Sequence, residues 1–221
     1  MGASRRAKLR DLLNRPELIR ALAVHDAFAA RIAERAGVPL LFLGGFGVAA
    51  SRLGLPDLGL LTAPEMIEAA RAIAARVAVP LIVDIDTGFG GVLNVARTVR
   101  ELEAAGVAGV LIEDQVFPKR CGHFAGKRVV PVPEMLDRLH AALRSRRHDD
   151  FIVIARTDAR AVEGLDAALE RALHYREAGA DVCFVEAPRS LEELRLIPQT
   201  VPGPHLANML TGGQTPIVSC D

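Results

Sequence analysis

Short apolar runs, each bounded by turn-forming residues, recur along the whole chain. Between them lie segments with the spacing of amphipathic helices, such as Phe28, Ile32 and Ala36, which carry charges on the opposite face. Glycine follows several of these segments, as at Gly37 and Gly179, where a helix is expected to end. The pattern predicts seven β-strands, at Leu18–Val24, Leu40–Gly45, Leu81–Asp86, Val110–Asp114, Ile152–Thr157, Val182–Ala187 and His205–Met209.

Strict alternation of strand and helix indicates a parallel sheet covered by helices, because parallel strands need long crossover connections. Two α/β architectures fit, an open doubly wound sheet and a closed (β/α)8 barrel of the TIM type. Polar residues favour the barrel, because they follow nearly every predicted strand and the strand ends of a barrel converge on one mouth. These residues are Asp26, Gly44, Gly45, Asp84, Asp86, Glu113, Asp114, Arg156, Asp158, Glu186 and Asn208.

No linker or change of composition divides the sequence, so we expect a single barrel domain over residues 1–221. The chain supplies seven strand–helix units, whereas a complete barrel of this type has eight. We therefore expect the domain to be C-terminally incomplete, without an eighth strand and a final helix. Two explanations stay open, a fragment of a longer protein and a natural truncation.

The charge balance excludes some classes of partner. Lys and Arg number 27, as do Asp and Glu, so the net charge is zero. This argues against a nucleic-acid or anionic membrane surface. The longest apolar stretch, residues 38–50, is interrupted by glycines and is shorter than the ~20 residues that span a bilayer. Three cysteines and no visible secretory signal do not suggest a disulfide framework, so we expect a soluble cytoplasmic protein.

Carboxylates at the predicted strand ends suggest a divalent cation. Asp84 and Asp86 are two residues apart and point the same way if the strand continues, and Glu113 ends the next strand with Asp114 beside it. Three or four oxygen ligands without a nearby set of His or Cys ligands suit Mg²⁺ or Mn²⁺. The alternative is that these acids cap helices or form salt bridges.

A second group of reactive residues lies between the fourth and fifth predicted strands. Cys121 stands between two cations, Lys119 and Arg120, and the residues Gly122 and His123. Neighbouring positive charge is typical of a thiol that reacts as a thiolate or exchanges a proton, and Gly122 would let a ligand approach the backbone. The alternative is a solvated basic loop with an incidental cysteine. Cys183, within an apolar run, is expected to be a small core residue.

Two further features suggest carboxylate binding. The backbone amides around Gly44, Gly45 and Phe46 follow the second predicted strand and could hold an anion, or the glycines could simply make a tight turn. Arg156 could clamp a substrate carboxylate, or pair with Glu186 or Asp158 of this chain.

Six motifs follow one another along the chain, at residues 53–59, 84–90, 112–115, 119–123, 155–159 and 207–209. Together they resemble the isocitrate lyase/phosphoenolpyruvate mutase superfamily, most closely the group that holds methylisocitrate lyase, dimethylmalate lyase and carboxyphosphonoenolpyruvate mutase. The most diagnostic motif is Lys-Arg-Cys-Gly-His at residues 119–123, which is similar to the lyase signature.

The resemblance implies a role for each matching residue. Metal ligands for Mg²⁺, or Mn²⁺, would be Asp84, Asp86 and Glu113. Substrate-binding residues would be Gly44, Gly45, Phe46, Asp57, Gly122, Arg156, Glu186 and Asn208. Catalytic residues would be Cys121, Lys119, His123 and Arg156. In the implied reaction a 2-hydroxy acid loses its hydroxyl proton, the C–C bond breaks, and Cys121 protonates the carbanion.

The resemblance implies an oxo-acid lyase that acts on a branched 2-hydroxy di- or tricarboxylate such as 2-methylisocitrate. Two segments depart from the methylisocitrate lyases. Residues 42–46 lack their Tyr and Ser hydroxyls, and residues 212–216, Gly-Gly-Gln-Thr-Pro, are more similar to the phosphonomutase and dimethylmalate branch. The alternatives are therefore a phosphonomutase or an oxaloacetate decarboxylase on the same scaffold, or an inactive truncated homologue. With a full C-terminus the resemblance also implies a homotetramer or dimer.

Overall fold

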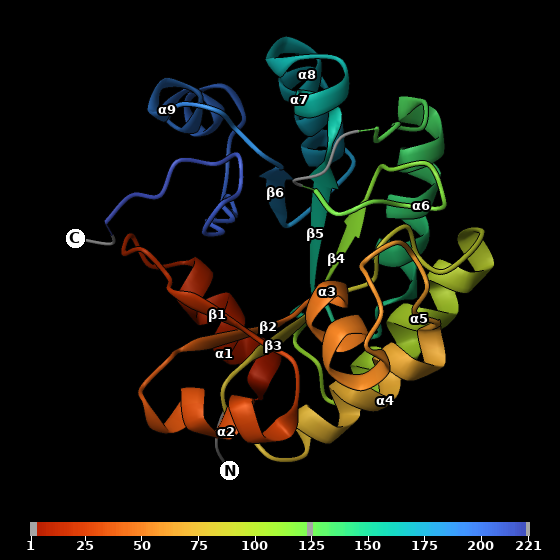
Figure 1. Ribbon diagram of the computed structural model, residues 1–221, viewed down its shortest axis with the longest axis vertical. Coiled ribbons are helices and arrows are strands. Elements are labelled where there is room, and N and C mark those ends of the chain that lie inside the picture. The colour runs from red at the N-terminus through yellow and green to blue at the C-terminus, as the bar shows by residue number, and fades with distance from the viewer. Residues whose placement is uncertain (1–3, 123–125, 220–221) are drawn as a thin grey trace.

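The computed structural model describes residues 4–122 and 126–219 and contains one six-stranded parallel sheet, shown in Figure 1. The strands follow one another in sequence order, and each pairs in parallel with the next. They are β1 (Ala21–Val24), β2 (Leu40–Leu43), β3 (Leu81–Asp84), β4 (Gly109–Glu113), β5 (Ile152–Thr157) and β6 (Val182–Val185). The helices are α1 (Arg5–Leu13), α2 (Ala27–Arg35), α3 (Gly45–Val48), η1 (Ala49–Leu53, a π-helical turn), α4 (Ala63–Ala74), α5 (Val92–Ala104), α6 (Val132–Ser145), α7 (Ala159–Val162), α8 (Leu165–Glu177) and α9 (Leu191–Thr200).

The sheet curls into a partial barrel. Helices α2, α4, α5, α6, α8 and α9 follow one another in an arc around its outer side (Figure 1). The sheet has β1 at one edge and β6 at the other, and these two strands do not pair. The expected TIM-type α/β fold without a complete barrel is therefore confirmed.

The prediction of a seventh strand at His205–Met209 is wrong within the residues that the structure describes. This segment begins as a neighbour of β6, with a parallel bridge between His205 and Cys183. The Leu206 N–H donates to the Cys183 carbonyl and the Cys183 N–H to the Pro204 carbonyl. The pairing does not continue beyond this contact, because the segment has no β-branched residue and contains Ala and Asn, which are depleted in strands.

Alternation along the strands produces two apolar layers. One set of strand residues packs under the helices and includes Leu41, Val83 and Val153. The opposite set lines the inside of the curled sheet and includes Ile82, Leu111 and Ile154. Side chains that point inward at the last position of a strand therefore lie at the mouth of the partial barrel.

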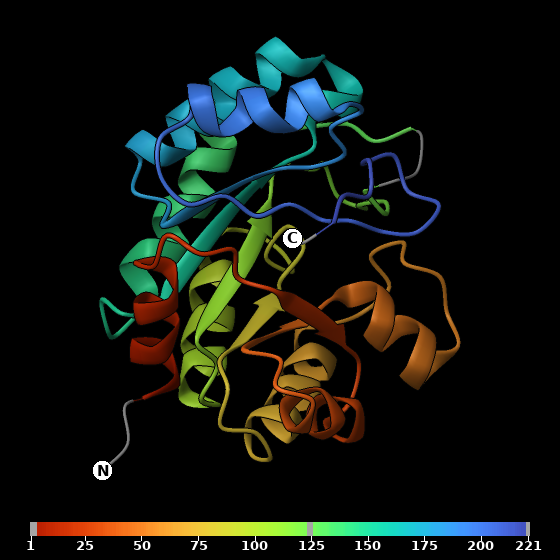
Figure 2. The same cartoon turned by 90° about the vertical axis from the view of Figure 1, so that its left-hand side faces the viewer.

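Helix α1 closes the opposite end of the sheet, where the strands begin (Figure 2). Its Leu9 is completely buried among the inward-facing strand residues. Arg5 donates to the carbonyls of Ala74 and Val77, which precede β3. Arg10 pairs with Asp181, which precedes β6, at 2.7 Å. The N-terminal helix thus connects both halves of the sheet.

None of the helices in the described parts of the chain is long and apolar enough to cross a bilayer. Even α6 has only 14 residues.

The packing of α1 is tested by Leu9→Ala. Removing a fully buried leucine leaves a cavity, so we expect the free energy of unfolding to fall by about 2–5 kcal/mol in urea denaturation. Asp11→Ala, an exposed position on the same helix, is the control and should change it by less than about 0.5 kcal/mol. Equal effects of the two substitutions would show that α1 does not close the barrel.

Candidate active site

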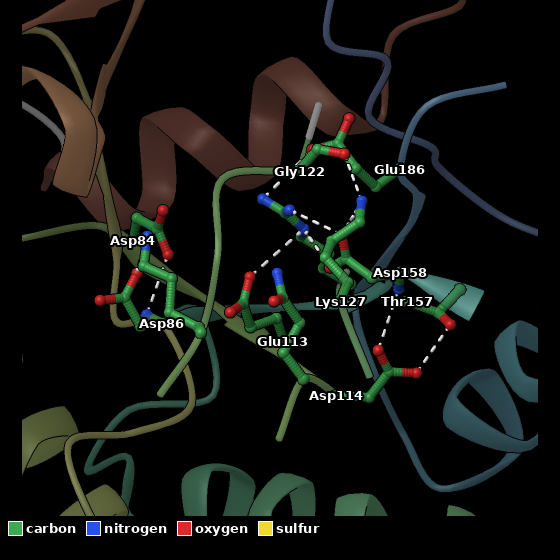
Figure 3. Close-up of polar contacts among 12 residues, drawn as sticks. Asp84, Asp86, Glu113, Asp114, Gly122, Lys127, Thr157, Asp158 and Glu186 are labelled. Carbon is green, nitrogen blue, oxygen red and sulfur yellow. Dashed lines mark hydrogen bonds and ion pairs between the residues drawn. The ribbon is translucent and has the colours of Figure 1, made fainter. Parts of the chain in front are cut away.

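The inward-facing ends of β3, β4 and β5 carry charged side chains (Figure 3). Asp84 lies two residues after the inward-facing Ile82, Glu113 two residues after Leu111, and Arg156 two residues after Ile154. Strand register makes Glu113 and Arg156 direct neighbours. All three are less than 9% exposed, so the predicted residues of adjacent strands do meet at the mouth.

Arg156 is the centre of one cluster. Its Nε and Nη2 donate to the two carboxylate oxygens of Asp158 at 2.9 and 3.0 Å. Its Nη1 lies 3.2 Å from Glu186 Oε2, and its Nε lies 3.5 Å from Glu113 Oε2. The guanidinium carbon also lies 5.5 Å from the centre of the Phe184 ring. Both of the predicted alternative partners, Glu186 and Asp158, therefore do pair with this arginine.

Lys119 is the centre of the other cluster. Its ammonium group lies 2.5 Å from Asp57 Oδ1 and 2.9 Å from Asp86 Oδ1. Asp86 is held in turn by its backbone N–H, which donates to Asp84 Oδ1 at 2.9 Å. The lysine side chain is only 4% exposed, so it joins the segment that contains Asp57 to the end of β3.

The glycines after β2 lie against this second cluster. A Cβ atom built on Gly45 would lie 3.4 Å from Asp86 Oδ1 and 3.7 Å from Lys119 Nζ. Gly45 begins the short helix α3, and Gly44 precedes it. Phe46 is 63% exposed. The structure thus brings the start of this segment to the mouth, as the sequence predicted.

The stretch that contains Cys121 also reaches the mouth. A Cβ atom on Gly122 would lie 2.5 Å from Arg156 Nη2 and 2.6 Å from Glu186 Oε2, so any other residue here would force these side chains to shift. Cys121 is partly exposed and directly precedes it. His123 lies outside the described residues.

Burial and neighbouring charges shift the pKa values of these groups. It raises the pKa of Asp86 to about 7, with the charge of Asp84 adding to the shift and Lys119 opposing it. Burial also raises the pKa of Glu113 well above its usual range. For Asp158 the effect of burial is outweighed by the charges of Arg156 and Lys127, which hold its pKa below the usual value.

The donor set fits a hard divalent cation. Six carboxylates, those of Asp57, Asp84, Asp86, Glu113, Asp158 and Glu186, share the mouth with three cations, Lys119, Lys127 and Arg156. Glu113 Oε1 is buried and has no hydrogen-bond partner among the residues that the structure describes. Within 4–122 and 126–219 no three His, Cys, Asp or Glu side chains form a complete metal site. Mg²⁺ needs no such set, because it keeps several waters and binds through one or two carboxylates.

Asp114 does not belong to the mouth. It lies one residue beyond the inward-facing Glu113 and points to the outer layer, where it is fully buried. It accepts hydrogen bonds from Thr157 Oγ1 at 2.7 Å, from the Asp158 N–H at 2.9 Å and from Tyr175 OH at 2.8 Å. The suggestion that it could serve as a fourth metal ligand is therefore wrong.

Two groups, one at the mouth and one behind it, were not predicted from sequence. Lys127 is buried and its Nζ lies 2.8 Å from Asp158 Oδ1, although it follows the basic motif by several residues. Tyr175 lies behind the mouth, where its hydroxyl donates to Asp114. It is the single tyrosine of the sequence, and because a tyrosine that becomes buried needs a partner for its hydroxyl, this residue was the one available signal.

Asn208, one of the predicted substrate-binding residues, is half-buried in the segment that follows the His205 bridge. Cys183, as expected, is a buried residue of β6, 1% exposed.

A cavity of about 540 Å³ lies beside the mouth, between α4 and α5. Its walls include Leu61, Ile67, Phe89, Asn94 and Phe117. None of the charged residues in the two clusters lines it, so this cavity is separate from them.

Comparison with known proteins identifies relatives over nearly the whole chain. The family model described as phosphoenolpyruvate phosphomutase matches residues 9–219. A 2,3-dimethylmalate lyase of Eubacterium barkeri is 49% identical over 96% of this chain and 73% of its own length. A 2-methylisocitrate lyase of Bacillus subtilis is 47% identical over 97% of this chain and 70% of its own length.

Solved structures give the same result. An oxaloacetate acetylhydrolase bound to 3,3-difluorooxalacetate has a TM-score of 0.95 at 42% identity, with coverage of 98% of this chain and 75% of that chain. A 2,3-dimethylmalate lyase, a PEP mutase/isocitrate lyase superfamily member, has a TM-score of 0.94 at 39% identity, with coverage of 100% and 75%. A phosphonopyruvate hydrolase in complex with oxalate and Mg²⁺ has a TM-score of 0.82 at 35% identity, with coverage of 91% and 70%.

The fold, the ordered motifs at the strand ends and these similarities agree. The chain belongs to the phosphoenolpyruvate phosphomutase family of enzymes, within the isocitrate lyase/PEP mutase superfamily, and its similar relatives include named carbon–carbon lyases.

Proposed function

We propose that this protein is a Mg²⁺-dependent carbon–carbon lyase. Its substrate is a branched 2-hydroxy di- or tricarboxylate similar to 2-methylisocitrate, which it cleaves to a 2-oxo acid and, respectively, a mono- or dicarboxylate. The observation that carries the proposal is the arrangement of the mouth, where the residue after Cys121 lies against Arg156 and Glu186 beside a cluster of carboxylates. The names of the relatives support the same class of reaction.

Arg156 and the segment that starts at Gly44 are the proposed carboxylate-binding groups. Each nitrogen of the Arg156 guanidinium already has a carboxylate partner. Nε has a single hydrogen, which Asp158 accepts, but Nη1 and Nη2 carry two hydrogens each, so a substrate carboxylate would accept the second hydrogen of these two nitrogens. The backbone N–H groups around Gly45 would hold a second carboxylate, because they begin a helical segment.

Asp84, Asp86 and Glu113 are the proposed metal-binding residues, with Asp57 nearby. A bound Mg²⁺ would polarise the oxygen that becomes the carbonyl of the 2-oxo acid. The surplus of carboxylates at the mouth and the unpaired Glu113 Oε1 support this assignment. The related phosphonopyruvate hydrolase was solved with Mg²⁺, which supports the choice of metal.

Cys121 is the proposed acid. When a base removes the proton of the substrate 2-hydroxyl, the electron pair of the C–C bond stays on the leaving fragment as a carbanion next to a carboxylate. The Cys121 thiol then gives its proton to that carbon and becomes a thiolate. The partial exposure of Cys121 and the position of Gly122 against Arg156 support this role.

A phosphonomutase is the second candidate function. Residues 212–216, Gly-Gly-Gln-Thr-Pro, and the description of the matching family model favour it. A third outcome, cleavage of oxaloacetate, is suggested by the similarity to oxaloacetate acetylhydrolase.

Proton and phosphorus NMR of the purified protein with Mg²⁺ separate these candidates. We expect pyruvate to form from 2-methylisocitrate or from 2,3-dimethylmalate, and formation to stop in EDTA because the metal that polarises the substrate is removed. Products from phosphonopyruvate or oxaloacetate alone would contradict the proposed substrate class.

Cys121→Ser tests the proposed acid. A hydroxyl is a far weaker acid than a thiol, so we expect kcat to fall by about 10²–10⁴ while Mg²⁺ affinity is unchanged. Cys183→Ala is the control, because Cys183 is buried in β6 away from the mouth, and it should retain kcat. An unchanged kcat in Cys121→Ser would exclude the role.

Asp84→Ala tests the metal site. Loss of an anionic oxygen donor should weaken Mg²⁺ binding at least about tenfold in isothermal titration calorimetry, and activity should fall with it. Asp137→Ala, at an exposed position of α6, is the matched control and should bind Mg²⁺ like the wild type. Wild-type affinity in Asp84→Ala would remove this residue from the metal site.

A further inference from the structure

The stretch from Lys119 to Gly122 is tied to the barrel at three points. Lys119 is held by Asp57 and Asp86. The side chain of Gln115 makes two hydrogen bonds to the backbone of Arg120. Its Oε1 accepts from the Arg120 N–H and its Nε2 donates to the Arg120 carbonyl, each at 2.9 Å. The third tie is made by Lys127, whose ammonium group donates to the Gly122 carbonyl.

Lys127 is buried to an extent that is unusual for a lysine. Its side chain is 1% exposed, and its Nζ lies 2.8 Å from Asp158 Oδ1, which is itself completely buried. An ammonium group loses its hydration under these conditions, so the position is tolerated only because a carboxylate and a carbonyl replace the water. Such a group is held in one place.

Asp158 is in turn fixed from three directions. Arg156 donates two hydrogen bonds to its carboxylate, and Lys127 donates a third. Its backbone N–H donates to Asp114, which is locked behind the sheet by Thr157 and Tyr175. The Gly122 carbonyl is therefore connected through Lys127 to a buried hydrogen-bond network that reaches behind the sheet (Figure 3).

We propose that Lys127 is a positioning residue that holds the backbone of Gly122, and with it the thiol of Cys121, over Arg156. Lys127 and Arg156 both neutralise Asp158, but Lys127 also makes a contact outside this ion pair. The additional hydrogen bond to the Gly122 carbonyl is what joins the Cys121 stretch to β5. The catalytic consequence of this tie rests on the proposed lyase function, whereas the tie itself does not.

The test is the rate at which iodoacetamide alkylates Cys121 in the whole protein, measured peptide by peptide with mass spectrometry. Lys127→Met keeps the length of the side chain and removes its charge and its donors. We expect Cys121 to react faster on the order of tenfold, the change that follows from losing a charge-assisted hydrogen bond. The buried Cys183 serves as an internal reference for unfolding, and its rate should not change.

Arg128→Met is the matched control, because Arg128 is the next residue and is exposed. It should leave the rate for Cys121 at the wild-type value. A Cys121 rate in Lys127→Met that equals or lies below that of the control would overturn the proposal. If Lys127→Met does not fold, Lys127→Gln, whose shorter side chain cannot reach both partners, is judged by the same comparison.

Kinetics separate this inference from the proposed function. In an active enzyme, Lys127→Met should lower kcat more than it raises KM, because the acid is displaced while the carboxylate-binding groups stay in place. Faster alkylation in a protein without lyase activity would leave the tie standing and remove the proposed function. Unchanged alkylation and kcat in an active enzyme would remove the tie and leave the function.

Discussion

The site depends on the burial of Arg156 at the end of β5. A guanidinium at this depth is stable only with carboxylates around it, and these come from the last residue of β4 and from the residues that directly follow β5 and β6. Because neighbouring strands supply the partners, the register of the sheet also determines which charges surround Arg156. The same arrangement limits the residue at position 122, since a side chain larger than that of Gly122 would come too close to both Arg156 and Glu186.

Much of this arrangement follows from the sequence, because strands alternate with a period of two and parallel strands end at the same edge. Asp84, Glu113 and Arg156 could be placed at the mouth in this way. The same rule places Asp114 on the outer side, yet its proximity to Glu113 in the chain suggested a shared role. Lys127 could not be placed, because its partner Asp158 lies 31 positions further on.

The limits of the strand prediction have a different cause. The segment from His205 to Met209 has three apolar residues, which suggested a strand, but it has no β-branched residue and contains Ala and Asn, which are depleted in strands. Only the contact with β6 is present among the described residues, and pairing ends after the first bridge. The apolar residues of this segment therefore predicted a strand, whereas the segment forms a single bridge to β6.

Helix α1 has a consequence for the order in which the protein assembles. Its partners lie far along the chain, at Val77 before β3, at Asp150 before β5 and at Asp181 before β6. During synthesis the helix leaves the ribosome before all of these partners, and the last of them emerges only after about four-fifths of the sequence shown. The packing of α1 is thus complete only late in synthesis, and until then the inward-facing side chains of the growing sheet stay partly open to water at that end.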